Sequence, residues 1–286
     1  FWKPLFDELR AVNPNIRIIG EQADWMSYGR EIFEKADLDL VFAFPLGIAV
    51  SFLDKNQIQN KLDSTYLLTP PGKDQLIFIE NHDVDRFASR MNGELAKEKV
   101  GAAFNLLLKG TPLIYYGQEI GMQGIKHEVP TDGDQISRRE AFEWYKSTEG
   151  PGMAHWYKNS GIWWDKRYGK ANDGTSVEEQ IKNPNSLWNF YKTLISLRKQ
   201  YPALTYGEVR ILPNDNPGVI TFVRTLGEHK NWIWVAVNLT GTPQELEKPQ
   251  YTVNGFQGEV LCAEPTTSRM ESIRLSLPRY GIIVSR

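Results

Sequence analysis

The stretch "LIFIENHDVDRF" (Leu76–Phe87) joins four apolar residues directly to a cluster of polar ones. An apolar run without alternation is typical of a strand that is buried on both faces in a parallel sheet. The cluster that follows includes Asn81, His82 and Asp83. On their own, His82 and Asp83 fit either a turn that caps a helix or a site at the end of the strand.

Three further apolar runs have the same character and also end in polar or turn-forming residues. They are "IRIIGE", which ends at Glu21, "DLVFAFPL" (Asp39–Leu46) and "TPLIYYG" (Thr111–Gly117). Stretches with apolar residues at helical spacing, such as Val100–Leu108, lie between the runs. Strands that alternate with amphipathic helices favour a parallel α/β sheet, whose ligands gather at the carboxyl ends of the strands. The four strand ends are therefore expected to share one rim.

The pattern changes from about Leu204 onward. Short alternating runs such as "GVITFVRT" and "NWIWVAVNLT" are separated by Gly, Pro and Asn, which predicts a small antiparallel β-sandwich. We expect a first domain over residues 1–203 and a second over residues 204–286. Residues 123–185 are too many for an ordinary connection between a strand and a helix, and long loops of this kind usually serve a site.

Composition excludes several classes of function. The 286 residues carry a net charge of −2 with no basic patch, so nucleic acid is not an expected partner. No apolar run approaches the roughly 20 residues that cross a bilayer, so a membrane is not expected either. The single Cys262 excludes an internal disulfide, and the four isolated histidines argue against a metal site in this chain. Localisation stays open between bacterial secreted or periplasmic and cytoplasmic.

Several of these motifs together resemble those of the alpha-amylase family, glycoside hydrolase family 13. Gly20-Glu21 is similar to the end of its fifth barrel strand, and Asn81-His82-Asp83 to the end of its seventh. "GTPLIYYGQEIGM" (Gly110–Met122) is similar to its eighth-strand region, except that Gln118 stands where Glu is common. "SRRE" (137–140) followed by Trp144 resembles the loop after strand eight in the oligosaccharide-acting branch, near oligo-1,6-glucosidases and neopullulanases.

The resemblance implies strands five to eight of a (β/α)8 TIM barrel over residues 1–203, followed by the sandwich. It also implies a retaining glycosidase acting on α-glucosidic bonds of starch-like glucans or maltooligosaccharides, in which an acid and a nucleophile lie roughly 5–5.5 Å apart. Glu21 would be the general acid/base, in a partly dry site, and Asp83 would stabilise the transition state. The implied substrate-binding residues are Asn81, His82, Arg86, Trp25 and Trp144.

Alternatives remain open for several of these residues and for the activity. Arg86 fits either an ion pair that orients the loop or a surface cation, and Trp25 and Trp144 fit either sugar platforms or core packing. The same carboxylates would serve a transglycosylase. A non-catalytic glycan-binding fragment is a further alternative.

The family's nucleophile, an Asp after strand four, has no match in this chain. The chain resembles the part of the barrel that begins in the helix after strand four, so we expect it to be inactive alone. The expected partner is the N-terminal half of the barrel, from the same parent chain or from a second chain. Half a barrel would leave two strand edges uncovered. No cofactor is expected in this chain, and calcium is possible in the full-length enzyme.

Overall fold

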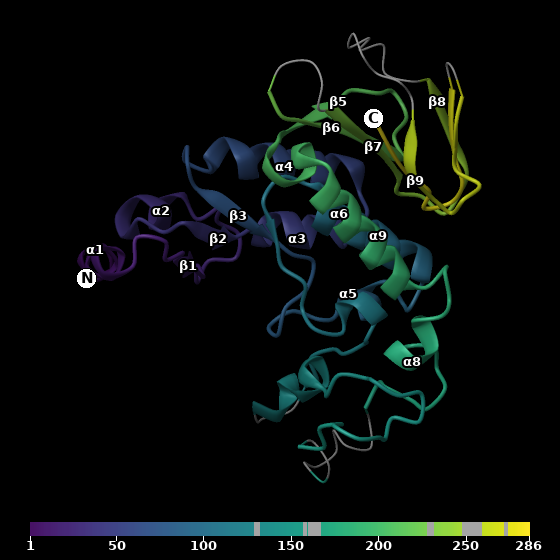
Figure 1. The fold of residues 1–286 in the computed structure, drawn as a ribbon, viewed down its shortest axis with the longest axis horizontal. Coiled ribbons are helices and arrows are strands. Elements are labelled where there is room, and N and C mark those ends of the chain that lie inside the picture. The colour runs from purple at the N-terminus through teal and green to yellow at the C-terminus, as the bar shows by residue number, and fades with distance from the viewer. Residues whose placement is uncertain (129–131, 157–158, 160–166, 228–231, 248–258, 272–273) are drawn as a thin grey trace.

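The computed structural model describes residues 1–128, 132–156, 159, 167–227, 232–247, 259–271 and 274–286 (Figure 1). A four-stranded parallel sheet with helices forms the first part of the chain, and two antiparallel sheets form the last part. No helix in these ranges combines the length and the apolar character that crossing a bilayer requires.

The parallel sheet carries its strands in the order of the sequence. The strands are β1 (Ile19–Gly20), β2 (Leu40–Phe42), β3 (Asp74–Ile77) and β4 (Thr111–Pro112). Each pairs in parallel with the next, so that Gly20 lies beside Val41 and Phe42 beside Leu76. This order and direction are those predicted for half of a (β/α)8 barrel. The carboxyl ends of β1 and β3 therefore lie on the same edge of the sheet, with β2 between them.

Helices connect and cover the parallel strands (Figure 1). They are α1 (Trp2–Val12), α2 (Arg30–Ala36), α3 (Phe44–Val50), α4 (Lys55–Leu68), α5 (Phe87–Arg90), α6 (Leu95–Leu107), η1 (Gln118–Ile120), η2 (Asp132–Arg139), α8 (Val177–Gln180), α9 (Leu187–Gln200) and α10 (Pro202–Tyr206). Helix α6 lies at the centre of the core, where Val100, Phe104 and Leu107 are fully buried, as their spacing predicts. Helix α9 packs against it through Leu194 and Phe190.

The second half of the predicted strand Asp39–Leu46 is wrong. Strand β2 ends at Phe42, and α3 begins at Phe44 with Pro45 in its first turn. Proline suits that position because the N–H that it lacks would have no partner inside the helix. The strand and the helix are both apolar and buried, so periodicity could not separate them. The rim beyond β2 consequently carries apolar rather than polar residues.

The last part of the chain forms the predicted antiparallel sandwich. One sheet has the order β5 (Glu208–Leu212), β6 (Val219–Thr225), β7 (Trp232–Asn238), β12 (Ile282–Ser285) and β9 (Val260–Glu264), and the other has β10 (Arg269–Met270), β11 (Arg274–Leu277) and β8 (Gln244–Glu247). Trp234 and Val223 of the first sheet share an apolar cluster with Leu275 and Leu277 of the second. The division at residues 203 and 204 stays a prediction.

The N-terminal side of the sheet carries uncovered apolar surface. No residue of α1 is buried, and Trp2, Leu9 and Val12 remain exposed although their spacing places them on one helix face. Ile19 of β1 is exposed as well. Within the described residues, β1 and β4 are the end strands of the parallel sheet, each bonded to one neighbour. Half a barrel is expected to end in two such strands, and their exposure in the whole protein stays a prediction.

Candidate active site

The end of β1 places Glu21 at the rim of the parallel sheet. Glu21 directly follows Gly20, and the next residue, Gln22, is buried. The Nε2 atom of Gln22 donates to the carbonyl oxygen of Phe42 at 2.8 Å and to that of Ser27 at 3.2 Å. Gln22 thereby ties the end of β1 to the end of β2. The partly dry surroundings expected for Glu21 are not formed by the described residues, because its side chain is exposed.

A tight turn after β3 carries the next polar residues. The side-chain oxygen of Asn81 accepts hydrogen bonds from the backbone N–H groups of Asp83 at 2.9 Å and Val84 at 3.1 Å. An Asn side chain that bonds the backbone two residues on is a common device for reversing the chain. Asn81 is buried, and its Nδ2 atom has no hydrogen-bond partner among the described residues. Asn81 therefore shapes the loop, and its contact with a substrate stays a prediction.

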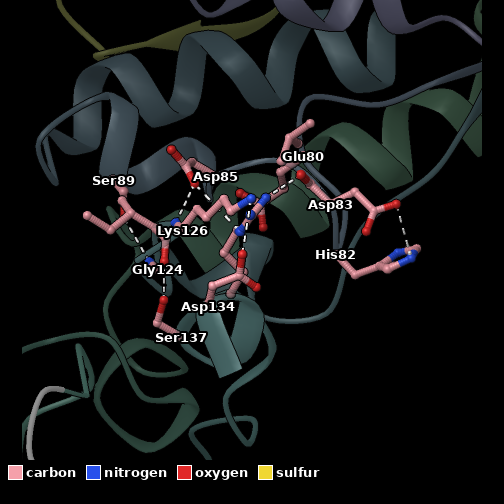
Figure 2. A network of polar contacts seen from close by, with 12 residues as sticks. Glu80, His82, Asp83, Asp85, Ser89, Gly124, Lys126, Asp134 and Ser137 are labelled. Carbon is pink, nitrogen blue, oxygen red and sulfur yellow. Dashed lines mark hydrogen bonds and ion pairs between the residues drawn. The ribbon is translucent and has the colours of Figure 1, made fainter. Parts of the chain in front are cut away.

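His82 and Asp83 lie in this turn with their side chains toward each other (Figure 2). His82 Nε2 lies 3.4 Å from Asp83 Oδ2, and Arg139 Nη2 lies 3.2 Å from Asp83 Oδ1. The side chains of His82 and Asp83 are 52% and 32% exposed, so a ligand at the rim can reach both. Neither residue caps the following helix, whose N-cap is Arg86. The helix-cap alternative is therefore wrong for this pair.

Arg86 lies beneath the loop rather than on it. Its side chain is 0% exposed, and Nη1 lies 3.0 Å from Oε1 of Glu80. The guanidinium lies over the rings of Tyr115 and Tyr116, 4.4 and 4.9 Å from their centroids. Burial raises the pKa of Glu80, and the charge of Arg86 opposes that rise.

This geometry bears on two expectations for Arg86. The surface-cation alternative is wrong, because the side chain is fully buried. The full burial of the guanidinium argues against direct contact with a substrate, and that contact stays a prediction. The carboxylate that pairs with Arg86 is Glu80, which also accepts a hydrogen bond from the backbone N–H of Phe87 through its other oxygen. Arg86 therefore orients the loop from below.

The two candidate sugar platforms are both partly exposed. Trp25 is 36% exposed and stacks on Phe44, with ring centroids 4.9 Å apart and ring planes 3° apart. Trp144 is 49% exposed and contacts Phe142 edge to face, with centroids 4.5 Å apart. Trp25 also packs on a fully buried residue, so sugar platform and core packing both remain open for the two side chains. Binding of sugar rings by either Trp stays a prediction.

The long loop after β4 reaches back to the rim. The hydroxyl groups of Tyr115 and Tyr116 donate to the carbonyl oxygens of Arg138 at 3.2 Å and Glu140 at 2.7 Å. Arg139 Nε donates to the carbonyl oxygen of His82 at 3.3 Å. The sequence interpretation missed the roles of Arg138, Arg139 and Glu80 in building the rim. Two adjacent arginines in a loop of unusual length were the available signal.

Two buried glutamates in the same loop bind protons near neutral pH. Burial raises the pKa of Glu140 to about 7, and burial together with the nearby charge of Asp173 raises that of Glu143 to about 8. Oε1 of Glu140 accepts a hydrogen bond from the backbone N–H of Tyr168 at 3.3 Å. The loop that contacts the rim is therefore expected to respond to pH.

The described residues include no group of three or more His, Cys, Asp and Glu side chains that could hold a metal ion. Two of the histidines lie instead beside single carboxylates, His82 beside Asp83 and His155 beside Glu149 at 3.5 Å. Calcium in the full-length enzyme stays a prediction.

Three curated proteins illustrate what the chain is similar to. The "Alpha-amylase 3" of Dictyoglomus thermophilum is 26% identical over 84% of this chain and 46% of its own length. The oligo-1,6-glucosidase of Halalkalibacterium halodurans is 26% identical over 66% of this chain and 37% of its own length. The trehalose synthase/amylase TreS of Mycobacterium tuberculosis is 28% identical over 74% of this chain and 41% of its own length. The chain thus spans about half or less of the length of these relatives.

Solved structures and a family model agree with these similarities. The crystal structure of the alpha-amylase from H. orenii superposes with a TM-score of 0.77 at 26% identity, covering 99% of this chain and 55% of the other. The family model described as the alpha-amylase catalytic domain matches residues 1–207. That match includes β1 to β4 and every rim residue described above. The chain therefore belongs to the alpha-amylase family of glycoside hydrolases.

Proposed function

We propose that this chain provides the acid/base side of the active site in a retaining glycosidase that acts on α-glucosidic bonds of starch-like glucans or maltooligosaccharides. The observation that carries the proposal is the exposed His82–Asp83 pair on the same sheet edge as Glu21. Neighbouring parallel strands lie about 4.8 Å apart, so β1 and β3 are separated by about 10 Å, a span that one sugar ring and its hydroxyls can bridge.

Each residue has a stated role in this proposal. Glu21 protonates the glycosidic oxygen and later activates water, and Asp83 binds hydroxyls of the sugar as its ring gains positive charge. His82 donates an N–H to a hydroxyl of the same ring. Trp25 and Trp144 offer flat apolar faces to neighbouring sugars. The nucleophile comes from the N-terminal half of the barrel.

The test replaces the acid in the full-length protein. Glu21→Gln keeps the size of the side chain but cannot deliver a proton, so turnover of a maltooligosaccharide should fall by at least about 100-fold while its binding is retained. Glu31→Gln is the matched control, because Glu31 is an exposed glutamate whose carboxylate pairs with Lys35 on α2. If Glu21→Gln turned over substrate at the native rate, the assignment of Glu21 would fail.

Transfer of the sugar to another sugar is the second candidate. It is supported by the similarity to the trehalose synthase/amylase TreS, whose name combines the two activities. The same residues serve both reactions, and the acceptor alone differs. Product analysis with excess glucose distinguishes them, because transfer yields new oligosaccharides and hydrolysis yields only shorter ones.

The part played by the N-terminal half is tested with the chain itself. The purified 286-residue chain should show no turnover of maltooligosaccharide, and addition of an N-terminal half-barrel should restore it. Hydrolysis by the chain alone at the rate of the full-length protein would contradict the missing nucleophile. Binding of glucan without turnover in the full-length protein would instead favour the non-catalytic alternative.

A further inference from the structure

Arg138 is a buried cation that reaches the backbone of the rim loop. Its side chain is 3% exposed, and Nη1 donates to the carbonyl oxygen of Asp83. Its Nε atom lies 3.6 Å from Oδ1 of Asp85. Arg138 therefore contacts the chain on both sides of Val84, at Asp83 and at Asp85.

Hydrogen bonds hold the segment around Arg138 in place. Ser137 Oγ donates to the carbonyl oxygen of Ile125, and the backbone N–H of Lys126 donates to Oδ1 of Asp85 at 2.7 Å. The hydroxyl of Tyr115 donates to the carbonyl oxygen of Arg138 itself at 3.2 Å. The segment that carries Arg138 is thus held by Tyr115, which follows β4, and by the neighbouring loop.

The peptide groups on both sides of Asp83 are consequently fixed from different directions. The N–H of Asp83 is bonded to Asn81 Oδ1, within the same turn. The C=O of Asp83 is bonded to Arg138, from a loop some 55 residues later in the chain. With both groups held, only rotation of the side chain remains for Asp83.

We propose that Arg138 is a positioning residue that holds the Asp83 carboxylate in its working orientation. The inference rests on the proposed function, because it concerns the orientation of a residue that stabilises the transition state. The hydrogen bond from Arg138 does not touch the substrate, but it fixes the position of Asp83. Such a bond affects the chemical step, because a displacement of the catalytic group by about 1 Å can lower the rate on the order of 100-fold. Ground-state binding should change much less.

The kinetic test uses the full-length protein with three variants. Arg138→Met should lower kcat by about 100-fold with KM within about threefold, and Arg138→Lys should recover part of the loss because its ammonium can still donate to the Asp83 carbonyl. Arg198→Met is the matched control. Arg198 is also buried and donates from Nη1 to the carbonyl oxygen of Leu106 at 2.7 Å, at the end of α6.

Arg198→Met should lower the melting temperature while leaving kcat, corrected for the folded fraction, unchanged. An unchanged kcat in Arg138→Met would overturn the proposal. An equal loss of kcat in both Met variants would overturn it too, because the effect would then be structural.

An NMR measurement tests the conformation of the loop at Asp83 independently of turnover. Asp83-Val84 is the one Asp-Val pair in this sequence, so ¹³C′-Asp and ¹⁵N-Val labels select this peptide group in the chain. In Arg138→Met the selected peak should shift and broaden, and in Arg138→Lys it should return toward the native position. A peak that stays in place in Arg138→Met would overturn the proposal. If the native protein shows no glycosidase activity, the proposed function fails, and this peak still decides whether Arg138 positions the loop.

Discussion

Two arginines in this molecule, Arg86 and Arg224, have no exposed surface, and their buried charges have different kinds of partner. Arg86 at the rim pairs with a carboxylate, Glu80, at 3.0 Å. Arg224 in β6 has backbone carbonyls as its partners and donates to Leu107 at 2.7 Å and to Gly207 at 2.8 Å. Burial lowers the pKa of Arg224 to about 10.

The difference follows from what each site must do. The carbonyls at the end of α6 lack partners within the helix and carry partial negative charge, so a cation there ties the sandwich to the first part of the chain. At the rim, Arg86 instead forms an ion pair with Glu80, and Tyr115 and Tyr116 lie against its guanidinium. These contacts fix the orientation of both charged side chains. A loop that presents Asp83 gains a defined geometry from such a pair.

The largest effect is expected from breaking the pair at the rim. Arg86→Met leaves Glu80 buried without its cation and should lower the free energy of unfolding by about 3–5 kcal/mol at pH 8. Burial raises the pKa of Glu80 once Arg86 is gone, so the carboxyl takes up a proton as the pH falls and the deficit shrinks toward pH 5. Urea unfolding at both pH values measures this. A deficit independent of pH would contradict the role of Glu80.

A somewhat smaller effect is expected at the junction with the sandwich. Arg224→Met removes the hydrogen bonds to Leu107 and Gly207 but leaves no buried carboxylate behind, so the loss should be about 2–4 kcal/mol. The loss should be the same at pH 5 and pH 8, unlike that of Arg86→Met. Equal pH dependence in the two variants would remove the distinction between the two arginines.

The buried glutamates of the long loop should make the native protein less stable as the pH rises. The folded pKa values of Glu140 and Glu143 lie at about 7 and about 8, above those of the unfolded chain, so the folded state binds more protons in this range. The contribution of these two glutamates to the free energy of unfolding is then greatest below about pH 4.5 and is lost toward pH 8, with a slope of up to about 1.4 kcal/mol per pH unit for each group.

Glu143→Gln should remove the contribution of Glu143 to this slope. Unfolding by urea from pH 5 to pH 9 measures it, with the exposed Glu31→Gln as a control that should keep the native slope. A slope that Glu143→Gln leaves intact would show that Glu143 does not bind the proton.

Much of this arrangement could be predicted from the sequence, because it depends on local patterns. The apolar run at β3 and the polar residues after it predicted a strand that ends at the rim. The spacing of apolar residues in α6 predicted which face of that helix is buried. The helix at Phe44 could not be predicted in the same way, because a buried helix and a buried strand are both continuously apolar. Pro45 was the available signal of a helix start.

The contacts that shape the site were harder to predict because they join distant segments. An ion pair that orients the loop through Arg86 was one of two alternatives, and the structure identifies Glu80, only six residues earlier, as its partner. The contacts from Arg138 and Arg139 to the rim span more than fifty residues. Nothing in the spacing of "SRRE" indicates which strand end these arginines reach.

The smallest effect is expected from the outer arginine, and it separates the two neighbours in "SRRE". Arg139 pairs with Asp83 at 3.2 Å, but the side chains are 41% and 32% exposed, so water and salt screen the charges. Arg139→Gln should therefore lower the free energy of unfolding by less than about 1 kcal/mol, and 1 M NaCl should remove most of that difference. Arg138→Met should cost more and respond little to salt, because Arg138 is buried. Equal sensitivity of the two variants to salt would contradict this explanation. Burial would then not account for the difference between Arg138, which holds the backbone, and Arg139, which pairs with the Asp83 carboxylate.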